Sequence, residues 1–190
     1  MAIGKYIEQE YRNPGEELKR VWRERMIAWR KEPAIVRIER PTRIDRARAL
    51  GYKAKQGYVL VRVKLDRGGR MRPQFKGGRR PKTARRKKIV GKNYRWIAEE
   101  RASRKYKNCE VLGSYEIAKD GLCYWFEIIL ADREQVSRYE GMEWLARARG
   151  RAFRGLTAAA KKSRGILTHK GKGAEKLRPS LRSHGRRGKN

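Results

Sequence analysis

The sequence predicts an α+β fold, in which helices cover a small, mostly antiparallel sheet of about four strands and long basic irregular extensions leave the core. Segments with helical and with strand periodicity alternate along the chain of 190 residues. Two strand-like segments are separated by a single tight turn, which favours antiparallel pairing. Glycine-rich basic stretches interrupt this order, and they contain too few aliphatic side chains to form a core.

The first predicted helix begins at Asn13 and Pro14, which are typical of the N-cap and of the first helical position. Apolar residues then recur at helical spacing, and Trp22 and Trp29 lie on that stripe. Tryptophans on such a stripe favour packing in the core over a platform for stacking bases. Pro33 ends the run, because proline lacks the amide N–H that a helix needs.

A strand, a short helix and a second strand follow. Residues 34–39 have strand character. Thr42, with Asp45 three residues later, predicts a capping box for a short helix that Gly51 ends. In residues 57–65, a series of apolar residues alternates with Leu60, Arg62 and Lys64, which predicts a half-buried strand.

The second half of the chain contains a helix and a hairpin. Asn93 is a candidate N-cap for a helix over the following 14 residues, YRWIAEERASRKYK. Residues 109–118 and 122–131 read as two strands, and Asp120 and Gly121 between them predict a hairpin turn.

The segments after the hairpin have weaker patterns. Residues 134–153 favour helical or irregular structure, with Trp144 and Leu145 as apolar anchors. Residues 154–165 predict a short helix that Gly165 ends.

The positive charge is concentrated in two segments. The formal net charge of the whole chain is +32. Residues 67–95 contain 13 Lys or Arg and no acid, while residues 147–190 contain 15 Lys or Arg and one acid. These segments together carry +27, which leaves +5 for the other 117 residues. We therefore expect one domain over residues 1–190, with a core of residues 1–66 and 93–146, a basic extension at 67–92 and a basic C-terminal extension at 147–190.

Such a charge requires a polyanion, because like charges repel each other in a compact fold. A membrane is disfavoured, since no apolar run approaches the roughly 20 residues of a spanning helix and the N-terminus lacks the apolar stretch of a signal peptide. We expect a cytoplasmic protein that contacts no membrane. Apolar residues such as Met71 and Phe75 within the extensions favour segments that become ordered on RNA over merely disordered tails.

RNA is favoured over DNA as the polyanion. The sequence shows no helix-turn-helix, zinc-finger or zipper pattern. Its basic segments are long and punctuated by glycine, which lets a backbone approach phosphates closely between folded RNA helices. The charge alone leaves open an architectural DNA-binding protein, which would co-purify with the nucleoid and survive RNase.

Catalytic and metal-binding patterns are lacking. The two cysteines, Cys109 and Cys123, form no C-x-x-C pair, and the histidines, His169 and His184, lie far from them in sequence. No phosphate-binding loop or nucleophile elbow is present. We expect no enzyme, no small-molecule substrate and no protein-bound cofactor or metal; any structural Mg²⁺ or K⁺ is expected to be bound by the RNA. An RNA-modifying enzyme is a third alternative, and the sequence shows no cofactor or catalytic signature for it.

Longer runs of sequence resemble a known family. Residues 40–70 and 93–132, together with the tail pieces 154–165 and 177–190, are similar to the archaeal and eukaryotic family of large-subunit ribosomal protein fifteen, which is unrelated to the bacterial protein of that number. The compact segment between Asp132 and Trp144 resembles the archaeal members. The resemblance implies a compact α+β core with basic extensions that enter ribosomal RNA. It also implies a monomer within the ribosome that touches neighbouring large-subunit proteins and supports the fold of the RNA.

The resemblance and the charge together imply three RNA-binding segments: the loop at residues 51–57 and the two basic extensions. The predicted RNA-binding residues are Tyr52, Lys53, Lys55, Gln56, Arg67, Arg70, Arg72, Phe75, Lys76, Arg79, Arg80, Lys82, Arg85, Arg86, Lys87, Lys88, Lys92, Arg147, Arg149, Arg151, Arg154, Lys161, Lys162, Arg164, Lys170, Lys172, Arg178, Arg182, Arg186, Arg187 and Lys189.

Overall fold

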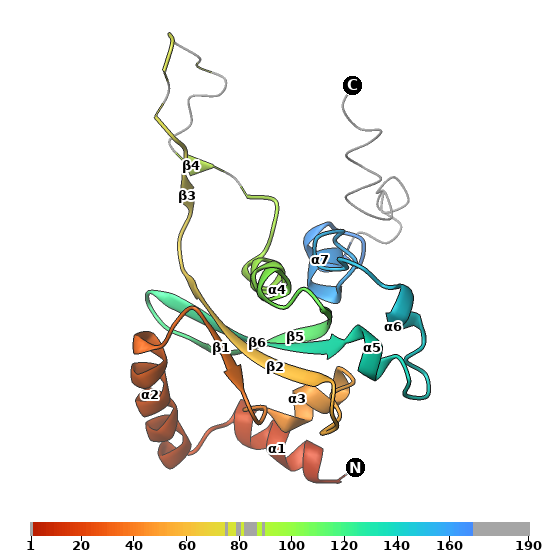
Figure 1. Ribbon diagram of the computed structural model, residues 1–190. Coiled ribbons are helices and arrows are strands. Elements are labelled where there is room, and N and C mark those ends of the chain that lie inside the picture. Colours follow the sequence, from red (N-terminus) through yellow and green to blue (C-terminus); the bar gives the residue numbers. More distant parts are fainter. Residues whose placement is uncertain (1, 75, 79–80, 82–86, 89, 169–190) are drawn as a thin grey trace.

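A four-stranded antiparallel sheet forms the centre of the molecule (Figure 1). The computed structural model describes residues 2–168 except 75, 79, 80, 82–86 and 89. The strands are β1 (Ile35–Ile38), β2 (Tyr58–Asp66), β5 (Cys109–Lys119) and β6 (Cys123–Asp132), arranged in the order β1-β2-β6-β5. Helices cover the sheet, so the predicted α+β class with about four antiparallel strands is confirmed.

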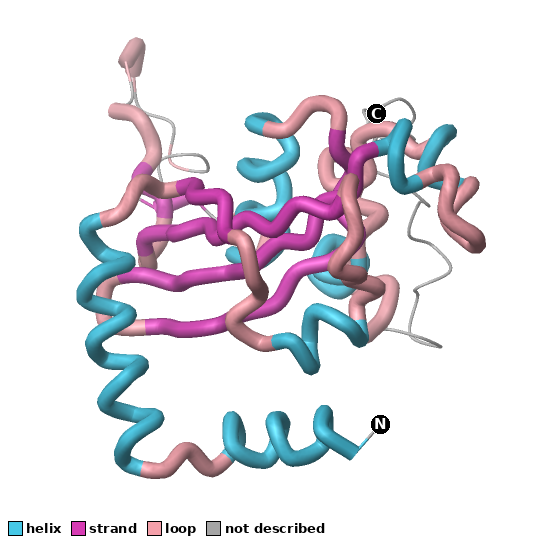
Figure 2. The backbone as a smooth tube through the Cα atoms, turned by 60° about the horizontal axis from the view of Figure 1, so that its bottom comes forward, coloured by secondary structure: helices cyan, strands magenta, loops and turns pink. Residues whose placement is uncertain are grey.

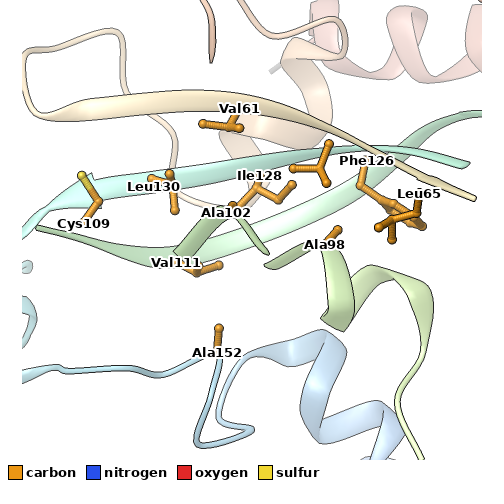
Figure 3. Close-up of a cluster of buried hydrophobic side chains, with 11 residues drawn as sticks. Val61, Leu65, Ala98, Ala102, Cys109, Val111, Phe126, Ile128, Leu130 and Ala152 are labelled. Carbon is orange, nitrogen blue, oxygen red and sulfur yellow. The ribbon is translucent and has the colours of Figure 1, made fainter. Parts of the chain in front are cut away.

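One face of the sheet packs against α4 (Tyr94–Lys105) and the C-terminal helix α7 (Ala158–Ser163). Ala98 and Ala102 of α4 are completely buried, because small side chains let the helix axis approach the strands. In Figure 3 their methyl groups lie among side chains of β2, β5 and β6. Ala152, from the segment that follows β6 and precedes α7, belongs to the same cluster. This cluster consists of Val61, Val63, Leu65, Ala98, Ala102, Cys109, Val111, Phe126, Ile128, Leu130 and Ala152.

The other face packs against α2 (Glu16–Lys31) and α3 (Ile44–Ala49). Trp29 of α2 lies 6.2 Å from Trp125 between ring centroids. Arg62 of β2 lies between the helix and the sheet, with its guanidinium 4.5 Å from the Trp29 ring centroid and 2.6 Å from a carboxylate oxygen of Glu32. The predicted half-buried character of β2 is confirmed, because Val61, Val63 and Leu65 are buried whereas Arg62 and Lys64 are only partly buried.

A helix that the sequence did not predict, α1 (Ala2–Arg12), precedes α2. Tyr11 stacks on Trp22 at 5.3 Å between centroids and donates its hydroxyl to the Thr42 carbonyl oxygen, 2.8 Å away. In Figure 2, α2 runs across the strands and α1 lies apart from them. The tryptophan at position 22 thus packs on another helix rather than on the sheet.

Two of the predicted helix starts were wrong. Helix α2 begins at Glu16 after Gly15, and the amide of Asn13 donates instead to Gln9 at the end of α1. Helix α3 has Arg43 at its N-cap without a side-chain cap, because the hydroxyl of Thr42 donates to buried Glu127. Asn13 thus belongs to the end of the preceding helix, whereas a contact with a distant residue, Glu127, replaces the cap expected from Thr42.

Other local predictions were confirmed. Asn93 caps α4 by accepting a hydrogen bond from the Trp96 amide at 2.8 Å. Asp120 makes the hairpin turn by accepting from the backbone amides of Leu122 and Cys123. Gly51 follows α3 with a φ of +89°, which glycine adopts readily.

Short helices connect β6 to α7. These are α5 (Arg133–Val136), capped by Asp132, and α6 (Trp144–Arg147). Leu145 is buried as predicted, whereas Trp144 is 43 % exposed and does not anchor the core. No helix in the described part of the chain is long and apolar enough to cross a membrane.

Candidate nucleic-acid interface

The first basic extension leaves the sheet as a two-stranded arm. Strand β3 (Arg70–Met71) pairs with β4 (Lys87–Lys88), with Arg70 opposite Lys88 and Met71 opposite Lys87. Figure 1 shows this ladder projecting away from the sheet beyond α4. All four of these side chains are exposed.

The root of the arm is fixed by aromatic residues. The Tyr94 hydroxyl accepts a hydrogen bond from the Gly68 amide at 2.9 Å and donates one to the Gly68 carbonyl at 2.8 Å. Its ring stacks on Tyr124 with centroids 4.9 Å apart. Arg67 lies 5.0 Å from the Tyr124 centroid and donates to the Asp120 carbonyl. A fixed root sets the direction in which the arm projects.

The beginning of the C-terminal basic segment is built into the core. Ala159 and Ala160 are buried against Trp96, whose indole N–H donates to the Ala152 carbonyl at 2.7 Å. The side-chain amide of Asn93 donates to the Ala159 carbonyl at 3.1 Å. Residues 148–163 therefore hold the origin of the tail against α4.

A buried carboxylate joins these elements. Glu99 of α4 accepts hydrogen bonds from the hydroxyls of Ser114 and Thr157, each at 2.5 Å. Burial raises the pKa of Glu99, because an ionised carboxylate is poorly solvated there; the two hydroxyls and the nearby arginines Arg95 and Arg151 act in the opposite direction.

Some cations that the sequence assigned to RNA are engaged with protein groups. Arg151 donates to the Val111 carbonyl at 2.7 Å and lies 4.7 Å from the Trp144 centroid, and burial lowers its pKa. Arg164 donates to the Gly155 carbonyl at 3.0 Å. Lys92 forms an ion pair of 2.6 Å with Glu100.

Other predicted residues are accessible to a partner. Those exposed are Lys53, Lys55, Gln56, Arg67, Arg70, Lys76, Lys87, Lys88, Arg147, Arg149 and Lys162. Those of intermediate burial, besides the three above, are Tyr52, Arg72, Arg154 and Lys161. Those outside the described residues are Phe75, Arg79, Arg80, Lys82, Arg85, Arg86, Lys170, Lys172, Arg178, Arg182, Arg186, Arg187 and Lys189.

Two further cations were missed because they lie in the nearly neutral body. Arg101 and Arg104 are exposed on α4, opposite its buried alanines. Arg104 lies 5.9 Å from the ring centroid of Phe153, which is 40 % exposed. The signal in the sequence is the short cluster RASRK at residues 101–105, whose three basic residues fall on one face of a helical projection.

On the opposite side of the sheet, helices α1 and α2 carry acidic as well as basic side chains. Cations of α1 and α2 pair with neighbouring acids, as in Lys19–Glu16 at 2.7 Å and Arg30–Asp120 at 2.7 Å. In the first basic extension, Lys92 forms an ion pair with Glu100. The arm lacks intrinsic counter-charges, since residues 67–95 contain no acid.

Comparisons with known proteins agree on one family. A family model described as Ribosomal L15 matches residues 2–184. The large ribosomal subunit protein eL15 of Nanoarchaeum equitans is 50 % identical over 188 residues, covering 97 % of this chain and 98 % of that protein. The protein of the same name from Methanocorpusculum labreanum is 48 % identical over 188 residues, covering 97 % and 96 %.

Proposed function

The chain belongs to the Ribosomal L15 family and is a structural constituent of the large ribosomal subunit, and from this premise we propose that it binds and stabilises folded ribosomal RNA through its basic extensions. The extensions are residues 67–92 and 147–190, and the loop at residues 51–57 is a third contact. Family membership favours RNA over DNA as the polyanion and places the protein in cytoplasmic ribosomes.

The observation that carries this proposal is the position of the two basic segments in the structure. The arm and the end of α7, from which the tail departs, lie on the same side of the sheet, with α4 between them (Figure 1). That side also presents Arg101 and Arg104. The α1–α2 side has cations that are partly neutralised by acids. One side of the molecule is thus suited to a polyanion.

The proposed mechanism is electrostatic. Lys and Arg side chains replace the cations condensed on RNA, so that RNA helices from different regions can approach each other. A fixed arm root and a packed tail origin reduce the conformational entropy that the protein loses on binding. Arginine adds planar contacts with phosphates and exposed bases.

The other expected properties follow from the same role. The family is one of ribosomal structural proteins, and we propose that this chain acts as a monomer within the subunit and has no catalytic activity of its own. Neighbouring large-subunit proteins are its expected protein partners. We propose that it needs no cofactor and that structural Mg²⁺ or K⁺ ions are bound by the RNA.

Excision of the arm tests the proposal. Residues 72–86 are replaced by an Asn-Gly turn, which keeps the β3–β4 ladder and removes seven cations. Affinity for isolated large-subunit RNA is then measured from about 50 to 200 mM salt. About ten phosphate contacts would lower the affinity of the intact chain roughly 10⁵-fold across that range. Excision should reduce the slope of log affinity against log salt by up to about six.

A matched control removes the same charge from the other side. Seven exposed cations of α1 and α2 are changed to glutamine: Lys5, Arg12, Lys19, Arg20, Arg23, Arg25 and Lys31. This control should change the slope by less than about two. The proposal is wrong if the intact chain shows no salt dependence, or if the control weakens binding as much as the excision while both proteins unfold cooperatively.

A further inference from the structure

A pocket of about 390 Å³ lies beside the loop at residues 51–57. Pockets that take small ligands span roughly 300–1,000 Å³. The pocket is lined by Arg37, Ile38, Glu39, Tyr52, Tyr58, Val59 and Leu60. Its lining residues are two tyrosines, three aliphatic residues, one cation and one anion; the cation and the anion are both exposed, and most of the lining surface is polar.

Three tyrosines form a continuous aromatic group at this pocket. Tyr52 meets Tyr58 edge-on, with centroids 6.1 Å apart and planes at 87°. Tyr58 is parallel to Tyr139, with centroids 6.3 Å apart and planes at 5°. Tyr139 is fixed by a hydrogen bond of 3.1 Å from its hydroxyl to the Gln56 carbonyl. A planar ligand in the pocket would meet aromatic rings with defined orientations.

The hydroxyl of Tyr58 is buried and has no hydrogen-bond partner among the described residues. Buried polar groups without a partner are rare in proteins, and each calls for an explanation. Tyr58 lines the pocket. This hydroxyl is closed to solvent, so a ligand in the pocket would contact other parts of Tyr58 and not its hydroxyl.

The loop is basic, and both of its ends have a defined backbone conformation. Gly51 and Gly57 have φ values of +89° and +86°, and the Gly57 carbonyl accepts a hydrogen bond of 2.8 Å from the Asp132 amide. Between these fixed ends, Lys53 and Lys55 are exposed. Lys55 lies 5.3 Å from the Tyr139 centroid. Cations around an aromatic pocket suit a ligand that is a flat ring attached to a phosphate.

We propose that this pocket receives a single unpaired nucleotide of large-subunit RNA whose base carries an amino group. The base would stack on Tyr52, its amino group would donate to Glu39, and its phosphates would lie near Arg37 and the loop lysines. This inference rests on the proposed function and adds to it a site that reads a base.

The choice of occupant follows from the pocket's chemistry. Proteins recognise unpaired RNA bases by stacking them on aromatic rings and by hydrogen bonds to their edges. Glu39 is the only acid that lines the pocket, and a carboxylate accepts hydrogen bonds but donates none. Adenine, guanine and cytosine present an amino donor to it, whereas uracil does not. An inserted side chain of a neighbouring protein would lack the phosphate that the cations favour.

Chemical probing of the RNA tests this site. Large subunits are purified from cells whose only copy of the protein is wild type or Tyr52→Leu, and their RNA is treated with dimethyl sulfate and kethoxal, which together report on adenine, cytosine and guanine. We expect one unpaired nucleotide to become about tenfold more reactive in the Tyr52→Leu subunits, because stacking on the ring is lost. Glu39→Ala, an exposed change that spares the core, should raise the reactivity of that nucleotide about threefold.

Controls separate this inference from the proposed function. Tyr52→Phe keeps the ring and Tyr6→Leu changes an exposed side chain of α1, so both should match wild type. If both Tyr52→Leu and Glu39→Ala proteins are present at wild-type amounts and no nucleotide changes, the base site is wrong while RNA binding by the extensions stands. If Tyr52→Leu fails to enter subunits, Glu39→Ala decides alone, and an unchanged profile overturns the site. Absence of the wild-type protein from large subunits would instead overturn the proposed function.

Discussion

Two glutamates are buried on opposite faces of the sheet, and each joins segments that are distant in sequence. Glu127 of β6 accepts hydrogen bonds from the Thr42 hydroxyl at 2.5 Å and from the Tyr115 hydroxyl. Glu99 of α4 joins β5 to the C-terminal segment, because it accepts hydrogen bonds from the hydroxyls of Ser114 and Thr157. Burial raises the pKa of both carboxyl groups, because the ionised form loses its hydration.

The raised pKa of Glu99 predicts a dependence of stability on pH. Between its ordinary value of 4.5 and its raised folded value, the folded state binds more protons than the unfolded state. The free energy of unfolding therefore falls as pH rises through this window, and Glu99→Gln removes that contribution. We expect urea denaturation at a series of pH values above 4.5 to show a shallower decline for the variant than for wild type.

Glu116 provides the matched control on the neighbouring strand. Its side chain is exposed, so Glu116→Gln should leave the pH dependence as in wild type. The account of Glu99 is contradicted if Glu99→Gln retains the full decline with pH, or if the decline is absent in wild type.

At the scale of single residues, sequence patterns identify a basic segment but not the partner of each cation. Arg151 and Lys92 lie in the two basic extensions. Yet Arg151 donates a hydrogen bond to the backbone carbonyl of Val111, and Lys92 donates one to the carboxylate of Glu100. Arg104 belongs to the nearly neutral body, yet it is exposed beside Phe153. These differences depend on contacts between distant segments, which no local pattern records.

At the scale of elements, the loop at residues 51–57 depends on two glycines for different reasons. A Cβ on Gly57 would lie 2.7 Å from Cγ2 of Val136, in addition to the strain of its positive φ. Gly51 has a similar φ but open space around it. We expect Gly57→Ala to lower the free energy of unfolding by more than about 2 kcal/mol and Gly51→Ala by about 1 kcal/mol.

Denaturant unfolding of the two variants measures that difference directly. Equal losses would show that backbone strain alone matters and that the close contact with Val136 relaxes without cost. Large-subunit RNA probing of the Gly51→Ala variant should remain as in wild type, because the loop keeps its position.

Elements with strong local signals were predictable, and elements fixed by distant contacts were not. Asp120 forms its turn and Asn93 its cap through bonds within three residues, so the sequence alone indicates both. Helix α1 has no acid in its first turn, and its end packs on Trp22 rather than on the sheet. Thr42 was expected to cap α3, but Glu127, 85 residues away, binds it instead.

At the scale of the whole molecule, the sheet separates two sides with different charge. The order β1-β2-β6-β5 inserts the last strand of the chain next to β2, which no local pattern predicts. This order brings α4, the arm root and the tail origin to one face and leaves α2 and α3 on the other (Figure 1). The segregation of charge along the sequence therefore becomes a segregation in space.

We propose that the side of the sheet that bears the arm faces ribosomal RNA in the large subunit. Ultraviolet crosslinking of purified large subunits, followed by nuclease and protease digestion and mass spectrometry, tests it most directly. We predict nucleotide adducts on peptides from residues 51–57, 67–92 and 147–190, and few on residues 2–31. Adducts concentrated on α1 and α2, with none on the arm, would contradict the account.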